Sequence, residues 1–267
     1  MSSYQKVTSL TAVSERVSTF NVTEDWLQGR TAFGGVSAGA AVRAMLQHVP
    51  NERTLRSLLV TFVAPVKEGE AHVTVSVLRS GRALHQVEAR VMQADQPCLI
   101  ALGSFGAPHE KYIAIEPSPS PEMPSPAEGI TMPFIPGITP NFTQHMEYQW
   151  TVDSVPFSGA NKAHCQGWFR FKEDEPVGWP ELVGLLDAWP PPAICTADGF
   201  VPASSVTWMI NFFSDVPEGG FSGSDWWKYD AVSTVARDGY ADTQGQLWDK
   251  NGALIARTRQ LAVEFSK

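Results

Sequence analysis

The sequence predicts an α+β protein built from two similar units, each with one helix and an antiparallel set of strands. The first observation behind this prediction is an apolar stripe at helical spacing near residue 40, followed by strand-like runs as far as residue 105. The second is an internal repeat, because residues 62–69 align without gaps on residues 212–219. Two further short matches follow in the same order, 79–81 with 237–239 and 99–101 with 254–256.

The first helix is predicted directly after the glycine pair Gly34 and Gly35. Its small residues at 38–41 would let a neighbour pack very close, and the two glycines would leave the first helical N–H groups open to a ligand oxygen. A helix packed tightly on a sheet explains the same residues without any ligand. The stripe that predicts the helix consists of Ala38, Ala41, Val42, Met45, Leu46 and Val49.

A meander of strands is predicted after this helix. Residues 55–66 form a mostly apolar run with β-branched members, which is typical of a strand. Alternation in 72–77 and again in 86–91, on either side of a turn at 79–82, predicts an antiparallel hairpin. A second turn at 94–97 leads into a last strand at 98–105.

A proline-rich segment separates the two units. Prolines at 117, 119, 121, 124 and 126 favour an extended connector without a core of its own. Beyond it, residues 180–189 predict a second helix, opened by Pro180 and closed by prolines at 190–192. We therefore divide the chain into an N-terminal unit (1–106), a connector (107–143) and a C-terminal unit (144–267), and expect the two sheets to pair edge to edge.

The composition and net charge of the chain indicate which classes of binding partner and which cellular location to expect. The chain has 267 residues, 43% of them hydrophobic, and a net charge of −8, which argues against nucleic acid and favours a small-molecule partner. Cys98, Cys165 and Cys195 are far apart and lack metal-site spacing, so we expect free thiols, no disulfide and no metal. Because no stretch approaches the ~20 apolar residues of a membrane span, we expect a soluble, cytoplasmic protein.

A helix entered through Phe33-Gly34-Gly35 and wrapped by a meander, present twice, resembles the double-hotdog acyl-CoA thioesterases of the acyl-CoA thioesterase II family. The residues at 32–35, the hairpin at 79–82 and the run at 247–256 carry the resemblance, which covers nearly the whole chain except the connector. It implies a tandem double hotdog, with two antiparallel sheets each wrapped around a long helix. It also implies an acyl-CoA substrate, no cofactor beyond the coenzyme A of that substrate, and chains that can pair into homodimers.

The family's catalytic set, carried over by position, is Asp187 on the second helix, Ser205 on the strand that follows, and Gln260 on the last strand. The hydroxyl has two rivals, Ser204 and Thr207, because Thr207-Trp208 stands where the family usually has an Asp-His pair.

Thioester hydrolysis by water would use these side chains in distinct roles. Asp187 would accept the water proton, Gln260 and Ser205 would hold the water, and the N–H groups of Gly34 and Gly35 would meet the carbonyl oxygen. Direct attack by the carboxylate is the other route. From the residue pattern alone, Asp187 would be a solvated acid at a helix end. Gln260, alternating with Leu261 and Val263, would be an exposed strand glutamine.

Two other functions remain open. One is a non-catalytic acyl-CoA-binding protein, which the missing Asp-His pair favours, and the other is an enoyl-CoA hydratase or dehydratase. Trp26 is the only tryptophan in the first half, against eight from Trp150 onward. If several of them line the acyl site, short, branched or aromatic acyl groups would be preferred.

Overall fold

The computed structural model describes residues 3–109 and 113–265. The N-terminal half holds two helices, α1 and α2, and a short 3-10 turn, η1 (Glu24–Trp26). Its strands and helices, in chain order, are α1 (Ser3–Val7), β1 (Thr11–Ser14), β2 (Val17–Val22), β3 (Leu27–Gln28), β4 (Thr31–Ala32), α2 (Gly34–Leu46), β5 (Thr54–Phe62), β6 (Gly69–Ser80), β7 (Leu84–Gln93) and β8 (Gln96–Gly106).

The second half repeats this order with a shorter helix. Its 3-10 turns are η2 (Pro126–Glu128), η3 (Asn141–His145) and η4 (Pro192–Thr196). Its strands and helix are β9 (Ile130–Thr131), β10 (Met146–Trp150), β11 (His164–Phe171), α3 (Trp179–Leu186), β12 (Ala203–Phe212), β13 (Trp227–Val232), β14 (Ala236–Arg237), β15 (Tyr240–Trp248) and β16 (Leu254–Glu264). Sequence analysis did not predict β1, β2, β10 or β11, which complete the outer parts of the sheet.

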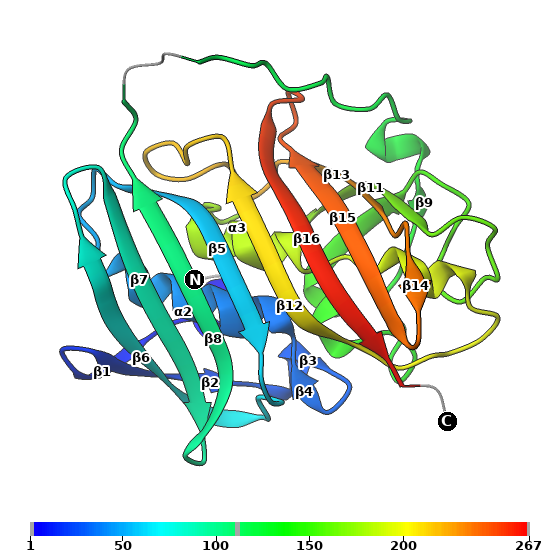
Figure 1. Ribbon diagram of the computed structural model, residues 1–267. Coiled ribbons are helices and arrows are strands. Elements are labelled where there is room, and N and C mark those ends of the chain that lie inside the picture. Colours follow the sequence, from blue (N-terminus) through cyan, green and yellow to red (C-terminus); the bar gives the residue numbers. More distant parts are fainter. Residues whose placement is uncertain (1–2, 110–112, 266–267) are drawn as a thin grey trace.

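The two halves share one continuous antiparallel sheet, as the edge-to-edge prediction requires (Figure 1). Its order is β1-β2-β6-β7-β8-β5-β12-β16-β15-β13-β11-β10-β9, with β14 paired to β15. The halves meet where β5 pairs with β12, from Thr61 opposite Thr207 to Ser57 opposite Asn211. Reading outward from this junction, the two halves present equivalent strands in the same order, so the molecule has an approximate twofold axis between β5 and β12.

Helices α2 and α3 lie side by side on one face of the sheet (Figure 1). They run antiparallel, because Gly35 lies against Gly184 while Gly39 lies against Pro180. A Cβ atom on Gly35 would be 3.0 Å from the Cα of Gly184, so the small residues allow the close packing that their sequence predicted. This arrangement puts the start of α2 next to the end of α3.

Helix α3 is shorter than predicted. It begins at Trp179, with the backbone N–H of Gly178 donating to Glu181 Oε2 at 3.0 Å, and it ends at Leu186. Asp187 is therefore the residue that caps the helix rather than a member of its last turn. The prolines at 190–192 prevent the helix from continuing.

The proline-rich segment crosses from β8 to β9 over one end of the molecule (Figure 1). It is held to the C-terminal half where Trp168 Nε1 donates to the carbonyl of Pro124 at 2.8 Å and Lys228 Nζ donates to Ser120 Oγ at 3.1 Å. Most of its described residues have no regular secondary structure, apart from η2, β9 and the start of η3. The division into 1–106, 107–143 and 144–267 stays a prediction.

The three cysteines are buried and free. Cys165 and Cys195 lie with their Sγ atoms 3.6 Å apart.

Among the described residues, no helix has the length and apolar character needed to span a membrane.

Candidate active site

Asp187 lies at the end of α3, against the first turn of α2. A Cβ atom on Gly34 would be 2.6 Å from Asp187 Oδ2 and 3.0 Å from the ring of Phe62. Only glycine leaves room at this position for the carboxylate. The backbone N–H of Gly35 also donates to Asp187, so the carboxylate is held by the entrance of the other helix.

Ser205 faces the same space because β12 contains a β-bulge. The pairing of β12 with β16 shifts between Ser205 and Thr207, which makes Val206 the extra residue. Trp208 points to the buried inner face of the sheet, and without the bulge Ser205, three residues earlier, would point to the outer face. The extra residue brings Ser205 back to the inner face.

Gln260 also lies on the inner face, so the pattern-based expectation of an exposed glutamine is wrong. It pairs with Trp208 on one side and Thr243 on the other, and both of these residues are buried. The alternation of apolar and polar residues along β16 gave the wrong face for Gln260. Leu261 and Val263 occupy the outer face of the strand, while the inner face carries the small residues Thr258 and Ala262.

One amide group connects the three side chains. Gln260 Nε2 donates to Asp187 Oδ1 at 3.1 Å and to Ser205 Oγ at 2.7 Å. Because Ser205 Oγ accepts this hydrogen bond, its own O–H remains able to donate to a further oxygen. The structure thus brings Asp187, Ser205 and Gln260 together beside Gly34 and Gly35.

Burial raises the pKa of Asp187 to about 7, although the hydrogen bonds from Gln260 and from Gly35 oppose the shift. Asp187 nevertheless keeps some accessible surface. A carboxylate with a pKa near neutral pH can both hold and release a proton under physiological conditions, which is the property of a general base.

The two rival hydroxyls do not join this cluster. Ser204 and Thr207 are exposed on the opposite side of β12. Trp208, at the position where the family usually has histidine, is buried and its Nε1 donates to Thr258 Oγ1. An indole, which does not titrate, therefore stands at the position where the family usually has a histidine.

Sequence reasoning missed Tyr4. This buried side chain lies between the two helices, with its hydroxyl 2.8 Å from the carbonyl oxygens of both Gly35 and Pro180. A Cβ on Gly39 or on Gly184 would overlap the Tyr4 side chain. The two helix glycines were the only signal in the sequence, and they do not reveal which residue enters the gap.

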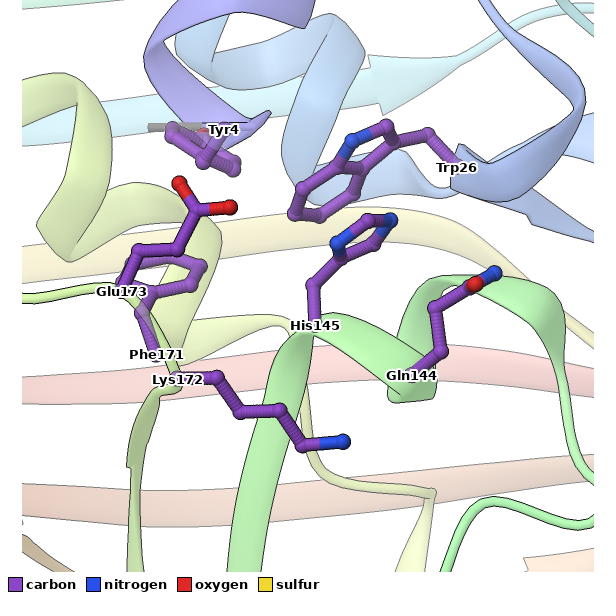
Figure 2. Close-up of a pocket in the computed structure, with 7 residues that line it drawn as sticks. All are labelled: Tyr4, Trp26, Gln144, His145, Phe171, Lys172 and Glu173. Carbon is purple, nitrogen blue, oxygen red and sulfur yellow. The ribbon is translucent and has the colours of Figure 1, made fainter. Parts of the chain in front are cut away.

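Figure 2 shows a different pocket, of about 150 Å³, which contains none of Asp187, Ser205 and Gln260. Trp26 stacks on His145 there, with ring centroids 4.3 Å apart, and burial lowers the pKa of His145. The faces of the Trp26 and His145 rings are therefore occupied by packing against each other. The pocket is lined by Tyr4, Trp26, Gln144, His145, Phe171, Lys172 and Glu173.

The fold and this cluster define a double-hotdog protein, and solved structures agree. A conserved protein of unknown function with a hot dog fold from Alicyclobacillus acidocaldarius is 23% identical, with a TM-score of 0.89 over 100% of this chain and 99% of that one. An acyl-CoA thioesterase II, TesB2, from Mycobacterium marinum is 17% identical, with a TM-score of 0.80 over 99% of each chain. The tesB protein of Mycobacterium avium subs paratuberculosis is 17% identical, with a TM-score of 0.79 over 98% of each chain.

Family models identify the chain more closely. Residues 22–106 match the acyl-CoA thioesterase N-terminal domain, and residues 118–263 match the acyl-CoA thioesterase C-terminal domain. The chain therefore belongs to the acyl-CoA thioesterase family. No curated protein matched the sequence.

Proposed function

We propose that this protein hydrolyses acyl-CoA thioesters to the free acid and coenzyme A, with Asp187 as the general base. The observation that carries the proposal is the shared amide of Gln260, which joins a carboxylate and a hydroxyl at 3.1 and 2.7 Å. A water placed between Ser205 and Asp187 would donate one proton to the carboxylate and accept the serine O–H. Its oxygen would then be free to attack the thioester carbon.

The start of α2 would stabilise the oxygen that becomes negative. Gly34 has no side chain, so a substrate carbonyl can approach its backbone N–H closely, and the positive end of the helix dipole favours the developing charge. The N–H of Gly35 already donates to Asp187. We therefore assign the oxyanion contact first to Gly34, with Gly35 orienting the base.

Attack by Asp187 itself, giving a mixed anhydride, is the alternative route. Hydrolysis in ¹⁸O-labelled water under single-turnover conditions detects this route where water opens the anhydride at the Asp187 carboxyl carbon, because one labelled oxygen then stays in the Asp187 side chain. Attack of water on the thioester carbon, or on the acyl carbon of an anhydride, places the label only in the released acid.

We expect short or compact acyl groups to be preferred over long chains. Trp189, two residues further on, packs within a buried group of aromatic rings formed by Tyr148, Trp150, Phe169 and Tyr229. Burial and the nearby charge of Asp187 raise the pKa of Tyr148, which agrees with its position close to the carboxylate. These rings fill the interior of the C-terminal unit, and the contact of Gly35 with Gly184 closes the space between the helices.

The test is the release of coenzyme A from a panel of acyl-CoAs that includes short, branched, aromatic and long straight chains. Hydrolysis with the highest kcat/KM for short or compact acyl groups supports the proposal. Binding of the same compounds without turnover would instead support a non-catalytic acyl-CoA-binding protein, the function favoured by Trp208 in place of histidine.

We also propose that two chains associate through the outer face of the sheet. Leu59 lies opposite Leu102 on β8 and Met209 on β12, and all three are exposed, at 45%, 36% and 38%. They form an apolar row across the junction of the halves. Light scattering of the wild type and of Leu59→Glu tests this; a monomeric wild type would refute it.

A further inference from the structure

The approximate twofold axis gives the active site a counterpart at the other end of the helix pair. Both central strands contain a bulge, between Leu55 and Ser57 in β5 and between Ser205 and Thr207 in β12. With these bulges superposed, Leu55 is the counterpart of Ser205 and Leu58 that of Trp208. Since Trp208 pairs with Gln260 and Leu58 pairs with Gly103, the counterpart of Gln260 is Gly103.

The counterpart site has lost the catalytic side chains. A leucine replaces the hydroxyl and a glycine replaces the amide. Phe105 and Met45 fill the space where a side chain on residue 103 would lie, because Phe105 Cε2 and Met45 Sδ are 2.7 and 2.8 Å from a Cβ built there. No hydrolysis can be expected at this end of the molecule.

The counterpart end of the helix pair nevertheless has an open cavity. A cavity of about 340 Å³ lies between the end of α2 and the start of α3. One of its wall residues, Val216, is the counterpart of Val66, whose carbonyl accepts from Ala32 just before α2. The cavity therefore lies at the end of the helix pair that corresponds, across the twofold axis, to the end that carries Asp187 and Gly34.

The lining combines apolar walls with a positive charge. Leu46, Val49, Trp179 and Val216 supply the apolar surface. Arg53 also lines the cavity; its guanidinium donates to the backbone carbonyls of Arg82 and Ala83 and forms no ion pair with a carboxylate in the described part of the chain, whereas Arg56 nearby pairs with Asp215 at 2.8 Å. A ligand with an apolar segment and an anionic group matches this combination.

We propose that this cavity is a second, non-hydrolytic site for acyl-CoA. It would take the acyl-pantetheine part against Leu46 and Trp179 and leave the phosphates near Arg53. The ligand class rests on the proposed function, while the existence of the cavity does not.

The experiment counts binding sites with an S-alkyl-CoA thioether, which cannot be hydrolysed, by isothermal titration calorimetry on the full chain. We expect two sites per chain in the wild type. Leu46→Trp and Val216→Trp, each of which fills the cavity, should each reduce the number to one while kcat for acyl-CoA hydrolysis is retained. Leu78→Trp, at a position on β6 that is 57% exposed, is the matched control and should keep both sites.

A wild type that hydrolyses acyl-CoA but binds a single thioether would overturn the second site and leave the proposed function intact. Two sites that persist in both cavity-filling variants, with thermal melts showing that these variants are folded, would also overturn it. A protein that neither binds the thioether nor releases coenzyme A would refute the proposed function and the second site together.

Discussion

Gln260 Nε2 lies 3.1 Å from Asp187 Oδ1, although the two residues belong to opposite ends of the C-terminal half, one after α3 and the other on β16. The contact gives the buried carboxylate a hydrogen-bond donor that favours its charged form. Burial is the larger influence and keeps the pKa of Asp187 at about 7. This balance between burial and one amide leads to the first prediction.

Replacing Gln260 with alanine should shift the pH dependence of the reaction. Loss of the amide donor removes a contribution that lowers the pKa of Asp187, so the pKa should rise and the base should ionise only at higher pH. The rising limb of kcat/KM against pH should therefore move upward from about 7. At pH 7 we expect kcat to fall by about 10²–10⁴-fold.

The control is Gln246→Ala on the neighbouring strand, where the side chain contacts Arg257 on the exposed face. Its profile should match that of the wild type. A Gln260→Ala enzyme with an unchanged pH profile would show that the amide does not act on the base.

Gly34→Ala should disable the enzyme without unfolding it. The added methyl group would lie 2.6 Å from Asp187 Oδ2, so the carboxylate must move, and a shift of about 1 Å can cost about 10²-fold in rate. Steady-state kinetics measure the loss. Gly106→Ala is the matched control, because the nearest atom to its new methyl group is 3.5 Å away; equal activities of the two variants would contradict the role of Gly34.

Asp187→Asn should stabilise the fold at alkaline pH. An aspartate with a pKa of about 7 in the folded protein and about 4 when unfolded binds more protons folded, so its contribution becomes unfavourable as pH rises from about 4 to about 7. Above pH 7 the penalty is complete, up to about 4 kcal/mol. Urea unfolding of the wild type and variant should differ at pH 8, and the difference should shrink toward pH 4.

Asp153→Asn, at an exposed position, should show no such pH-dependent gain. If Asp187→Asn is less stable than the wild type at pH 8, the carboxylate is not strained by its burial.

Glu181 should be the most important charged residue for stability. It is 5% exposed, accepts from Arg43 Nη2 at 2.6 Å and from the N–H of Gly178 at 3.0 Å, and so joins the two helices. Glu181→Ala would leave Arg43 partly buried without its carboxylate and should lower the free energy of unfolding by about 2–4 kcal/mol. Asp242→Ala, which breaks a pair with Arg259 whose side chain is 62% exposed, should cost less than about 1 kcal/mol. Urea unfolding measures both variants, and similar losses of unfolding free energy in Glu181→Ala and Asp242→Ala would contradict this prediction.

The match of 62–69 with 212–219 predicted the central sheet, because it places equivalent strands on both sides of one junction. The match of 99–101 with 254–256 is two residues out of register, because Phe62 pairs with Leu99 whereas Phe212 pairs with Ala256. Strands β10 and β11 were not predicted, although β10 alternates between the buried Met146, Tyr148 and Trp150 and the polar Glu147 and Gln149. In β11 the alternation is weaker, because Trp168 stands on the more exposed face.

The positions of the candidate site residues could not be predicted from the alternation of apolar and polar residues alone. Gln260 was assigned to the wrong face on alternation alone, since the inner face of β16 carries the smaller residues and not the more apolar ones. Ser205 reaches the inner face only through the bulge at Val206, and a bulge adds one residue without any compositional signal. Similarity to the family supplied these positions, and the structure shows that hydrogen bonds from Gln260 join the three side chains.

The most direct measurement is the rate of coenzyme A release by Asp187→Asn from the best acyl-CoA substrate at pH 8, where the wild-type carboxylate is ionised. If Asp187 is the general base, kcat should fall by about 10²–10⁴-fold while the KM stays close to the wild-type value, because asparagine keeps the shape and can still accept from Gln260. Turnover by Asp187→Asn at the wild-type rate would contradict the assignment of the base, and with it the proposed mechanism.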